Sequence, residues 1–97
     1  MKNFLQNLGL CRKAGVLEIG FDATIESVKK GKAVGVLIAC DISAKTLKEV
    51  TFHAEKFKVE IFPVHADMQM IKSILGKPAG VIAVTDRGLL QLMVNKK

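Results

Sequence analysis

The chain has 97 residues, a length that allows one packed core but not two, and 49% of its residues are hydrophobic. This apolar content excludes an intrinsically disordered chain, and no apolar run approaches the roughly 20 residues that a membrane-spanning helix needs. Fifteen lysines and arginines against nine acidic residues give a formal charge of +6, which attracts polyanions and favours nucleic acid as a partner.

The start of the chain and its cysteines predict a cytoplasmic protein. Polar residues at Asn3, Gln6 and Asn7 interrupt the apolar stretch that a secretory signal requires. Cys11 and Cys40 form no Cys-x-x-Cys pair, and isolated cysteines in a reducing compartment are most simply small buried apolar groups. We therefore expect neither a disulfide nor a catalytic thiol.

Apolar spacing, glycines and capping residues predict helices that alternate with strands along the chain. The predicted helices cover residues 2–13, 21–30, 44–57 and 67–75, with a last one after Thr85 or Asp86. The predicted strands cover residues 16–19, 34–39, 59–64 and 80–84. This order predicts a single α/β domain over residues 1–97, a three-layer α/β/α sandwich with a four-stranded mixed sheet.

The predicted core and caps come from residue types at particular positions. Ser43 and Asp67 are expected to cap the helices that follow them. In the helix over residues 44–57, the apolar stripe that runs from Leu47 to Phe57 is expected to face the core. His53 lies off this stripe and is expected in solvent. The chain has no Trp or Tyr, and its five Phe mostly fall on predicted core positions. Without stacking platforms, a folded RNA read by its shape is a better ligand than a single strand.

No motif in the sequence predicts catalysis, a metal site or a cofactor. The glycines at 31 and 35 lack the P-loop pattern, and His53 and His65 lack the spacing of metal ligands. Asp41 leaves two interpretations open: a ligand contact at a strand end, or a hydrogen bond to the backbone of the next helix. Asp86 follows the last strand in the same way, and there capping is favoured.

Residues that suit a phosphate backbone gather next to predicted strand and helix ends. We expect four segments to share one edge of the sheet, namely residues 20–22, 29–32, 41–43 and 77–80. Free N–H groups at a helix start suit phosphate, and small residues let a backbone approach closely. The predicted phosphate-neutralising residues are Arg12, Lys13, Lys29, Lys30, Lys32 and Lys77. Taken singly, each of them is better explained as an ordinary solvated side chain.

Ordered motifs over nearly the whole chain carry a family resemblance. Residues 8–15 (LGLCRKAG) and 81–88 (VIAVTDRG) resemble the opening and closing motifs of a bacterial group. Residues 30–33 (KGKA) and 37–43 (LIACDIS) resemble the boundary after the second helix and a strand end. With these motifs the chain resembles the ribosomal-protein superfamily of the L-seven-Ae and L-thirty-e type, particularly its small bacterial members.

The resemblance implies both a fold and a ligand. The fold is the same three-layer sandwich with a four-stranded mixed sheet, and the ligand is kink-turn or related internal-loop RNA, bound without cofactor or metal. The RNA face implied by the resemblance consists here of Gly20, Phe21, Asp22, Asp41, Ile42, Lys77, Pro78, Ala79 and Gly80.

The second helix departs from the kink-turn pattern Gly-x-Asn-Glu-x-x-Lys. Gly20 is retained, whereas Asp22, Ala23 and Glu26 stand in place of Asn, Glu and Lys. Asn both donates and accepts hydrogen bonds but ionised Asp only accepts, and each lost base contact is worth about 1–3 kcal/mol. These changes favour structured RNA in general over standard kink-turn recognition.

Two hypotheses follow from the sequence. The first is a cytoplasmic, monomeric, non-enzymatic protein that binds structured RNA, with ribosomal RNA or ribosomal particles as its partner and neither a membrane nor a small-molecule substrate. The alternative is a protein-interaction or assembly module of the same fold that has lost kink-turn specificity.

Overall fold

The computed structural model describes residues 4–94 and confirms the predicted alternation of helices and strands. The helices are α1 (Phe4–Ala14), α2 (Phe21–Lys29), α3 (Ala44–Lys56), α4 (Met68–Leu75) and α5 (Arg87–Val94). The strands are β1 (Leu17–Ile19), β2 (Gly35–Ile38), β3 (Ile61–Pro63) and β4 (Val81–Val84). All strands are shorter than predicted, and residues 2 and 3 of the first predicted helix lie outside the described residues.

The strands form one four-stranded mixed sheet in the order β1-β4-β2-β3. Strands β2 and β3 pair in parallel, whereas β4 is antiparallel to both of its neighbours, β1 and β2. Strands β1, β2 and β3 therefore point the same way and β4 points the opposite way. The sheet has two ends as a result: one where β1, β2 and β3 finish and β4 starts, and one where those three start and β4 finishes.

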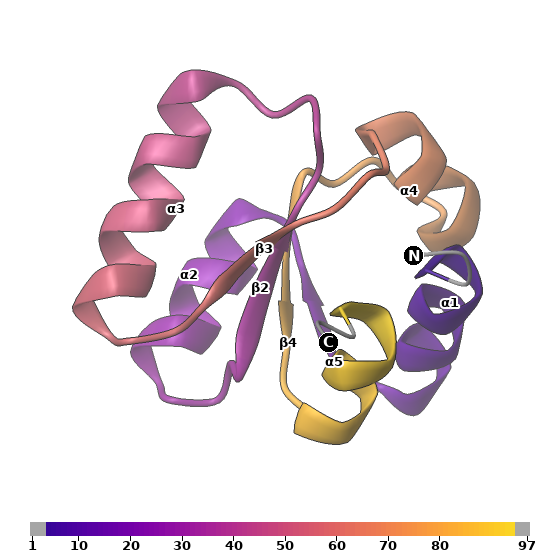
Figure 1. Ribbon diagram of the computed structural model, residues 1–97, viewed down its shortest axis with the longest axis horizontal. Helices are drawn as coiled ribbons and strands as arrows, with labels where there is room; N and C mark the ends of the chain where they lie inside the picture. Colours follow the sequence, from indigo (N-terminus) through magenta and orange to yellow (C-terminus); the bar gives the residue numbers. More distant parts are fainter. Residues whose placement is uncertain (1–3, 95–97) are drawn as a thin grey trace.

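Helices cover both faces of the sheet, as a three-layer α/β/α sandwich requires (Figure 1). Helices α1, α4 and α5 lie on one face, and α2 and α3 lie on the other. In the central strand β2, Leu37 packs into the core under the first group and Val36 into the core under the second. Ile82 and Ala83 of β4 divide in the same way. Both central strands are continuous apolar runs because both of their faces are buried.

The predicted helix caps are confirmed. The Ser43 hydroxyl and the Asp67 and Asp86 carboxylates each accept a hydrogen bond from the backbone N–H three residues later, at 3.2, 2.8 and 2.9 Å. Each such cap is worth about 1 kcal/mol, because it satisfies an N–H group that has no partner inside the helix. Thr85 and Asp86 were the two candidate capping residues of the last helix, and the carboxylate of Asp86 caps it. The Thr85 hydroxyl instead donates a hydrogen bond to the carbonyl of Val16 at 3.2 Å.

Helix α3 corrects several predictions about the core. Leu47 and Phe57 of the predicted stripe are each 39% exposed, and Phe52 is 62% exposed. Among the five phenylalanines, Phe4 alone is fully buried. His53 is half buried and packs edge-on against Phe52, with ring centroids 5.2 Å apart. The physical reason is position: α3 packs on α2 and lies over the edge strand β3, so its outer flank is open.

The two cysteines differ, and the prediction of burial is confirmed for one of them. Cys11 in α1 is fully buried, and its thiol lies 3.9 Å from the sulfur of Met93. Burial raises the pKa of the Cys11 thiol, and the negative charge of Asp86 raises it further. Cys40 is exposed, because it lies just beyond β2, where the chain leaves the sheet.

Candidate nucleic-acid interface

Three of the four predicted segments meet at the end of the sheet where β4 starts. The N–H of Gly20 donates to the carbonyl of Val81 at 2.9 Å, which joins the start of α2 to the start of β4. The N–H of Ala39 donates to the carbonyl of Gly80 at 2.9 Å, which joins the end of β2 to the same place. We call this surface the glycine rim. It comprises Gly20, Phe21, Asp22, Asp41, Ile42, Lys77, Pro78 and Gly80. Ala79, which was also predicted to belong to the RNA face, is only 5% exposed and packs in the core under α1, α4 and α5.

Gly80 is the most tightly packed position of the glycine rim. A Cβ atom there would lie 2.5 Å from Cγ2 of Ile42 and 3.2 Å from the sulfur of Met68. Real Cβ atoms do not approach so closely, so a larger residue at this position would displace the Ile42 loop or the start of α4. Glycine is therefore a structural requirement where the late loop passes the end of β2.

Gly20 opens α2 and leaves the first amides of that helix without a side-chain cap. Its φ of 105° favours glycine, and a Cβ there would meet nothing within 4 Å. The N–H groups in the first turn of a helix suit a phosphate or another anion. The exposed carboxylate of Asp22 stands in that same turn and opposes an anion. Phe21 turns inward, against the core under α2 and α3.

The structure gives the Asp41 carboxylate a backbone partner, and its contact with a ligand stays a prediction. Its Oδ1 accepts a hydrogen bond from the N–H of Met68 at 3.0 Å. The carboxylate therefore satisfies the first amide of α4, not that of the next helix α3, which Ser43 caps. Met68 thus belongs to the glycine rim through its backbone and through its contact with Gly80, a role that its sequence position did not indicate.

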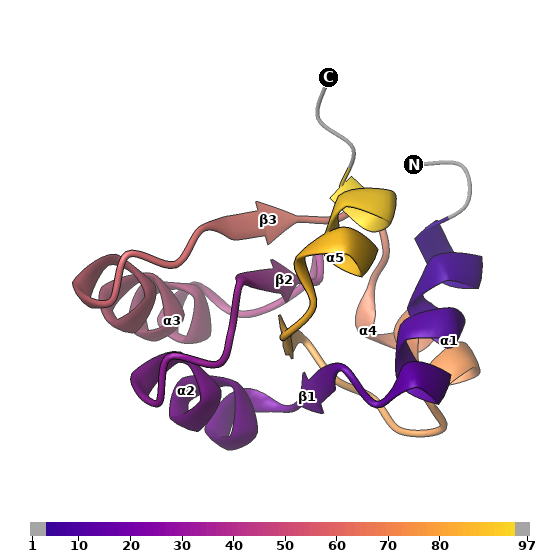
Figure 2. The ribbon, with the colours of Figure 1, turned by 90° about the horizontal axis from the view of Figure 1, so that it is seen from below.

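Lysines and arginines do not gather at the glycine rim, which corrects the expectation of a single charged edge. Lys77 stands there against the carboxylates of Asp22, Asp41 and Asp67. Helix α2 starts at the glycine rim and runs along the sheet to its other end, carrying the 29–32 segment about 14 Å away. Residues Arg12 and Lys13 at the end of α1 lie at that other end too (Figure 2).

We call the surface at that other end the basic rim. Three backbone hydrogen bonds join its segments: Val34 to Val84 at 2.8 Å, Thr85 to Val16 at 2.9 Å and Val36 to Glu60 at 3.0 Å. Its cations are all exposed and are Arg12, Lys13, Lys29, Lys30, Lys32, Lys58 and Arg87. The sequence did not single out Lys58 and Arg87, because their proximity to the others depends on the strand order.

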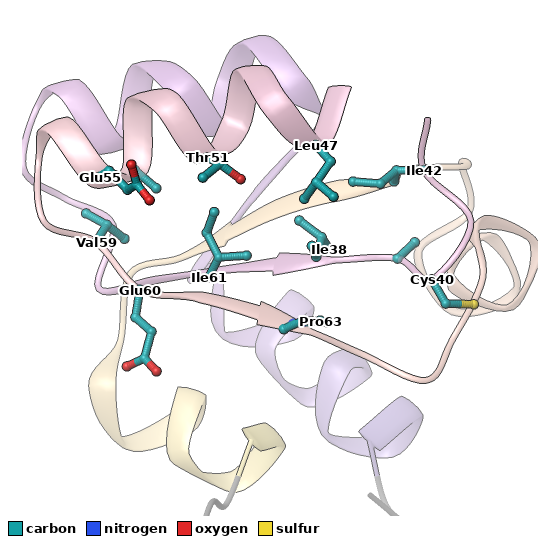
Figure 3. A pocket seen from close by; sticks show the side chains of 12 residues that line it. Ile38, Cys40, Ile42, Leu47, Thr51, Glu55, Val59, Glu60, Ile61 and Pro63 are labelled. Carbon is teal, nitrogen blue, oxygen red and sulfur yellow. The ribbon is translucent and has the colours of Figure 1, made fainter. Parts of the chain in front are cut away.

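A groove that the sequence did not predict lies between α3 and the sheet (Figure 3). Its volume is about 570 Å³, and its lining is mostly apolar, with Ile38, Leu47 and Ile61 among its side chains. Cys40 lies at one end of the groove, and Glu55 lies at the other (Figure 3). The groove exists because β3 is an edge strand and α3 overhangs it, an arrangement that single-sequence patterns do not encode.

Within residues 4–94, no three side chains of the His, Cys, Asp or Glu type are grouped in a way that could hold a metal ion. No described helix has both the length and the apolar character needed to cross a membrane.

The fold defines a class of protein: an α/β/α domain with a four-stranded mixed sheet, in which Gly20 and Gly80 lie together at one end of the sheet. The chain belongs to the ribosomal protein L7Ae/L30e/S12e/Gadd45 family, whose model matches residues 2–94. The chain is 31% identical to the RNA-binding protein YlxQ of Bacillus subtilis over 88 residues, which are 91% of this chain and 88% of that protein. It is 32% identical to the RNA-binding protein YlxQ of Enterococcus faecium over 81 residues, 84% of this chain and 78% of that one. It is 28% identical to the large ribosomal subunit protein eL30 of Eremothecium gossypii over 89 residues, 90% and 85% of the two chains.

Solved structures share the fold. A protein of unknown function from Bacillus halodurans superposes with a TM-score of 0.85 at 25% identity, over 96% of this chain and 97% of that one. The 15.5kD RNA binding protein of Giardia lamblia superposes with a TM-score of 0.75 at 17% identity, over 94% and 78%. At that identity, the second likeness shows the fold alone.

Proposed function

We propose that the chain acts as one cytoplasmic domain that binds structured RNA on or near the ribosome, without catalysis. Two kinds of finding support this function. The family is one of ribosomal proteins, and the YlxQ relatives carry the name RNA-binding protein. The positive formal charge of +6 adds a long-range attraction for RNA.

The observation that carries the proposal is the junction of the late loop, the end of β2 and the start of α2, which backbone hydrogen bonds from Ala39 to Gly80 and from Gly20 to Val81 hold together. The side chains of Ile42 and Met68 cover Gly80 there, whereas Gly20 has open space where a side chain would stand. Part of a folded RNA can approach Gly20 closely, because a Cβ there would meet nothing within 4 Å. Recognition would rest on shape, with Lys77 neutralising a phosphate beside the loop.

The target differs from a standard kink-turn in this proposal. Asp22 is exposed in the first turn of α2, where it accepts hydrogen bonds from a base edge and repels phosphate. Glu26 lies one turn later and forms an ion pair with Lys30 at 3.1 Å, so it offers no cation to the backbone. We therefore propose an internal-loop RNA in which a base amino group, not a phosphate, faces the start of α2.

The test uses Gly80→Ala, with Gly9→Ala as a matched control. The new Cβ at position 80 meets Ile42 at 2.5 Å, whereas at position 9 it meets Cγ2 of Ile74 at an ordinary 3.5 Å. We expect Gly80→Ala to weaken binding of an internal-loop hairpin at least tenfold in a filter-binding assay at about 0.2 M salt, a change of roughly 1.4 kcal/mol. Gly9→Ala should bind as the wild type does.

A second variant keeps the test decisive if Gly80→Ala proves unstable. Lys77→Gln removes an exposed cation from the same loop and is expected to weaken hairpin binding without lowering the thermal unfolding temperature. Wild-type affinity in both variants would rule out the glycine rim as the RNA surface. A protein that purifies without nuclease-sensitive absorbance at 260 nm and binds no hairpin would point instead to the protein-interaction module.

A further inference from the structure

Seven of the twelve lysines and arginines in residues 4–94 lie at the opposite end of the sheet from the glycine rim. The basic rim draws on the ends of α1 and α2, the turns before β2 and β3, and the start of α5. The two rims lie at opposite ends of the sheet, about 14 Å apart along α2, so one phosphate group cannot contact both. The charge that attracts RNA and the backbone surface that suits its shape are therefore two separate places.

Two carboxylates on the basic rim already bind other groups of the protein. Glu26 pairs with Lys30 at 3.1 Å, with both side chains more than half exposed. Asp86 caps α5 through the N–H of Leu89 at 2.9 Å. Three more carboxylates lie here: Glu60 before β3, Glu55 in the last turn of α3, and Glu18 of β1, which lines one pocket with Lys30 and Lys32. The exposed cations nevertheless outnumber these carboxylates, so the rim presents positive charge to solvent.

Helix stability explains only part of this charge. Lysines and arginines near the ends of α1 and α2 are stabilised by the negative ends of those helices. Arg87 is the first residue of α5, where the positive end of a helix disfavours a cation. Lys58 has a φ of 59°, a left-handed conformation that costs a side-chain-bearing residue about 1 kcal/mol. The helix dipole thus does not account for Arg87, and the left-handed conformation of Lys58, which ends α3, does not account for its charge.

We propose that the basic rim is a second RNA-binding surface, which holds the phosphate backbone of a duplex segment distinct from the RNA at the glycine rim. With both surfaces occupied, the domain bridges two RNA segments. The inference rests on the proposed function only in taking RNA as the polyanion. Its contacts are electrostatic and independent of sequence, because lysines and arginines that contact phosphates carry no base readout.

The test compares two triple variants that remove the same charge. Lys29→Gln, Lys32→Gln and Lys58→Gln together change the basic rim. Lys45→Gln, Lys48→Gln and Lys72→Gln together change exposed lysines on α3 and α4. The probe is a labelled 16-base-pair RNA duplex, titrated at several salt concentrations. We expect the basic-rim variant to bind at least tenfold more weakly, with a slope of log affinity against log salt that is smaller by about 2.

Several outcomes would overturn the inference while leaving the proposed function intact. Equal losses in the two triple variants would mean that duplex binding follows net charge and not the basic rim. If the wild-type protein bound poly-glutamate but not the duplex, at equal concentrations of charge, the partner of the basic rim would be an acidic protein. The Gly80→Ala variant should bind the duplex as the wild type does, and a loss there would merge the two surfaces into one.

Bridging has its own readout. The wild-type protein, saturated with the internal-loop hairpin, should still retain the labelled duplex in a native gel, as a slower complex that contains both RNAs. The basic-rim variant should form only the hairpin complex. Displacement of the hairpin by the duplex at equal phosphate concentration would show one shared site and contradict the proposal.

Discussion

At the scale of single residues, the two thiols show how position decides chemistry. Cys11 lies under α5, where burial and the charge of Asp86 both disfavour the thiolate and so raise its pKa above the usual 9.0. Cys40 stands at the surface beside the glycine rim. Both cysteines have the same interpretation from the sequence, because neither belongs to a motif. Cys40 differs from Cys11 in being exposed, because β2 ends at Ile38, two residues before it.

We predict that one thiol per folded chain reacts quickly with a soluble disulfide reagent at pH 8, and that Cys40→Ser abolishes this fast phase. In denaturant, the wild type should titrate two thiols. The raised pKa of Cys11 also sets a pH dependence: its stabilising effect is complete below pH 9.0 and is lost as the pH rises above the raised value. Fast reaction of both thiols in the folded protein would contradict the burial of Cys11.

At the scale of elements, the order of helices and strands could be predicted and their neighbours could not. Ser43, Asp67 and Asp86 act as caps, as their positions indicated, because capping depends on residues only a few positions apart. The insertion of β4 between β1 and β2 depends on contacts that are distant in sequence. Without it, the 29–32 segment was placed at the wrong end of the sheet, and the exposure of Phe57 beyond the edge strand was missed.

Asp41 links two elements, and its removal tests that link. We predict that Asp41→Ala lowers the free energy of unfolding by about 1 kcal/mol, because the first amide of α4 loses its acceptor. Glu49→Ala, which removes an exposed carboxylate from the middle of α3, should change it by less than about 0.5 kcal/mol. Equal losses in chemical denaturation would mean that Asp41 does not support α4. A large change in RNA affinity with unchanged stability would favour the ligand-contact interpretation instead.

At the scale of the whole molecule, the sandwich places the glycine rim and the basic rim at opposite ends of the sheet, although the sequence predicted that their segments share one edge. The strand directions send the ends of α1 and α2 to one end of the sheet and the Gly80 loop to the other. The glycine rim supplies shape and amides, and the basic rim supplies charge. A domain arranged in this way would bind a folded RNA through one end and a neighbouring duplex through the other.

The proposal that the glycine rim binds RNA is tested most directly by backbone amide NMR shifts during titration with an internal-loop hairpin. We predict that the largest shifts fall on the amides of Gly20, Asp22, Ile42 and Gly80, with smaller changes along the groove between α3 and β3. Shifts confined to that groove, or to the basic rim alone, would contradict the account.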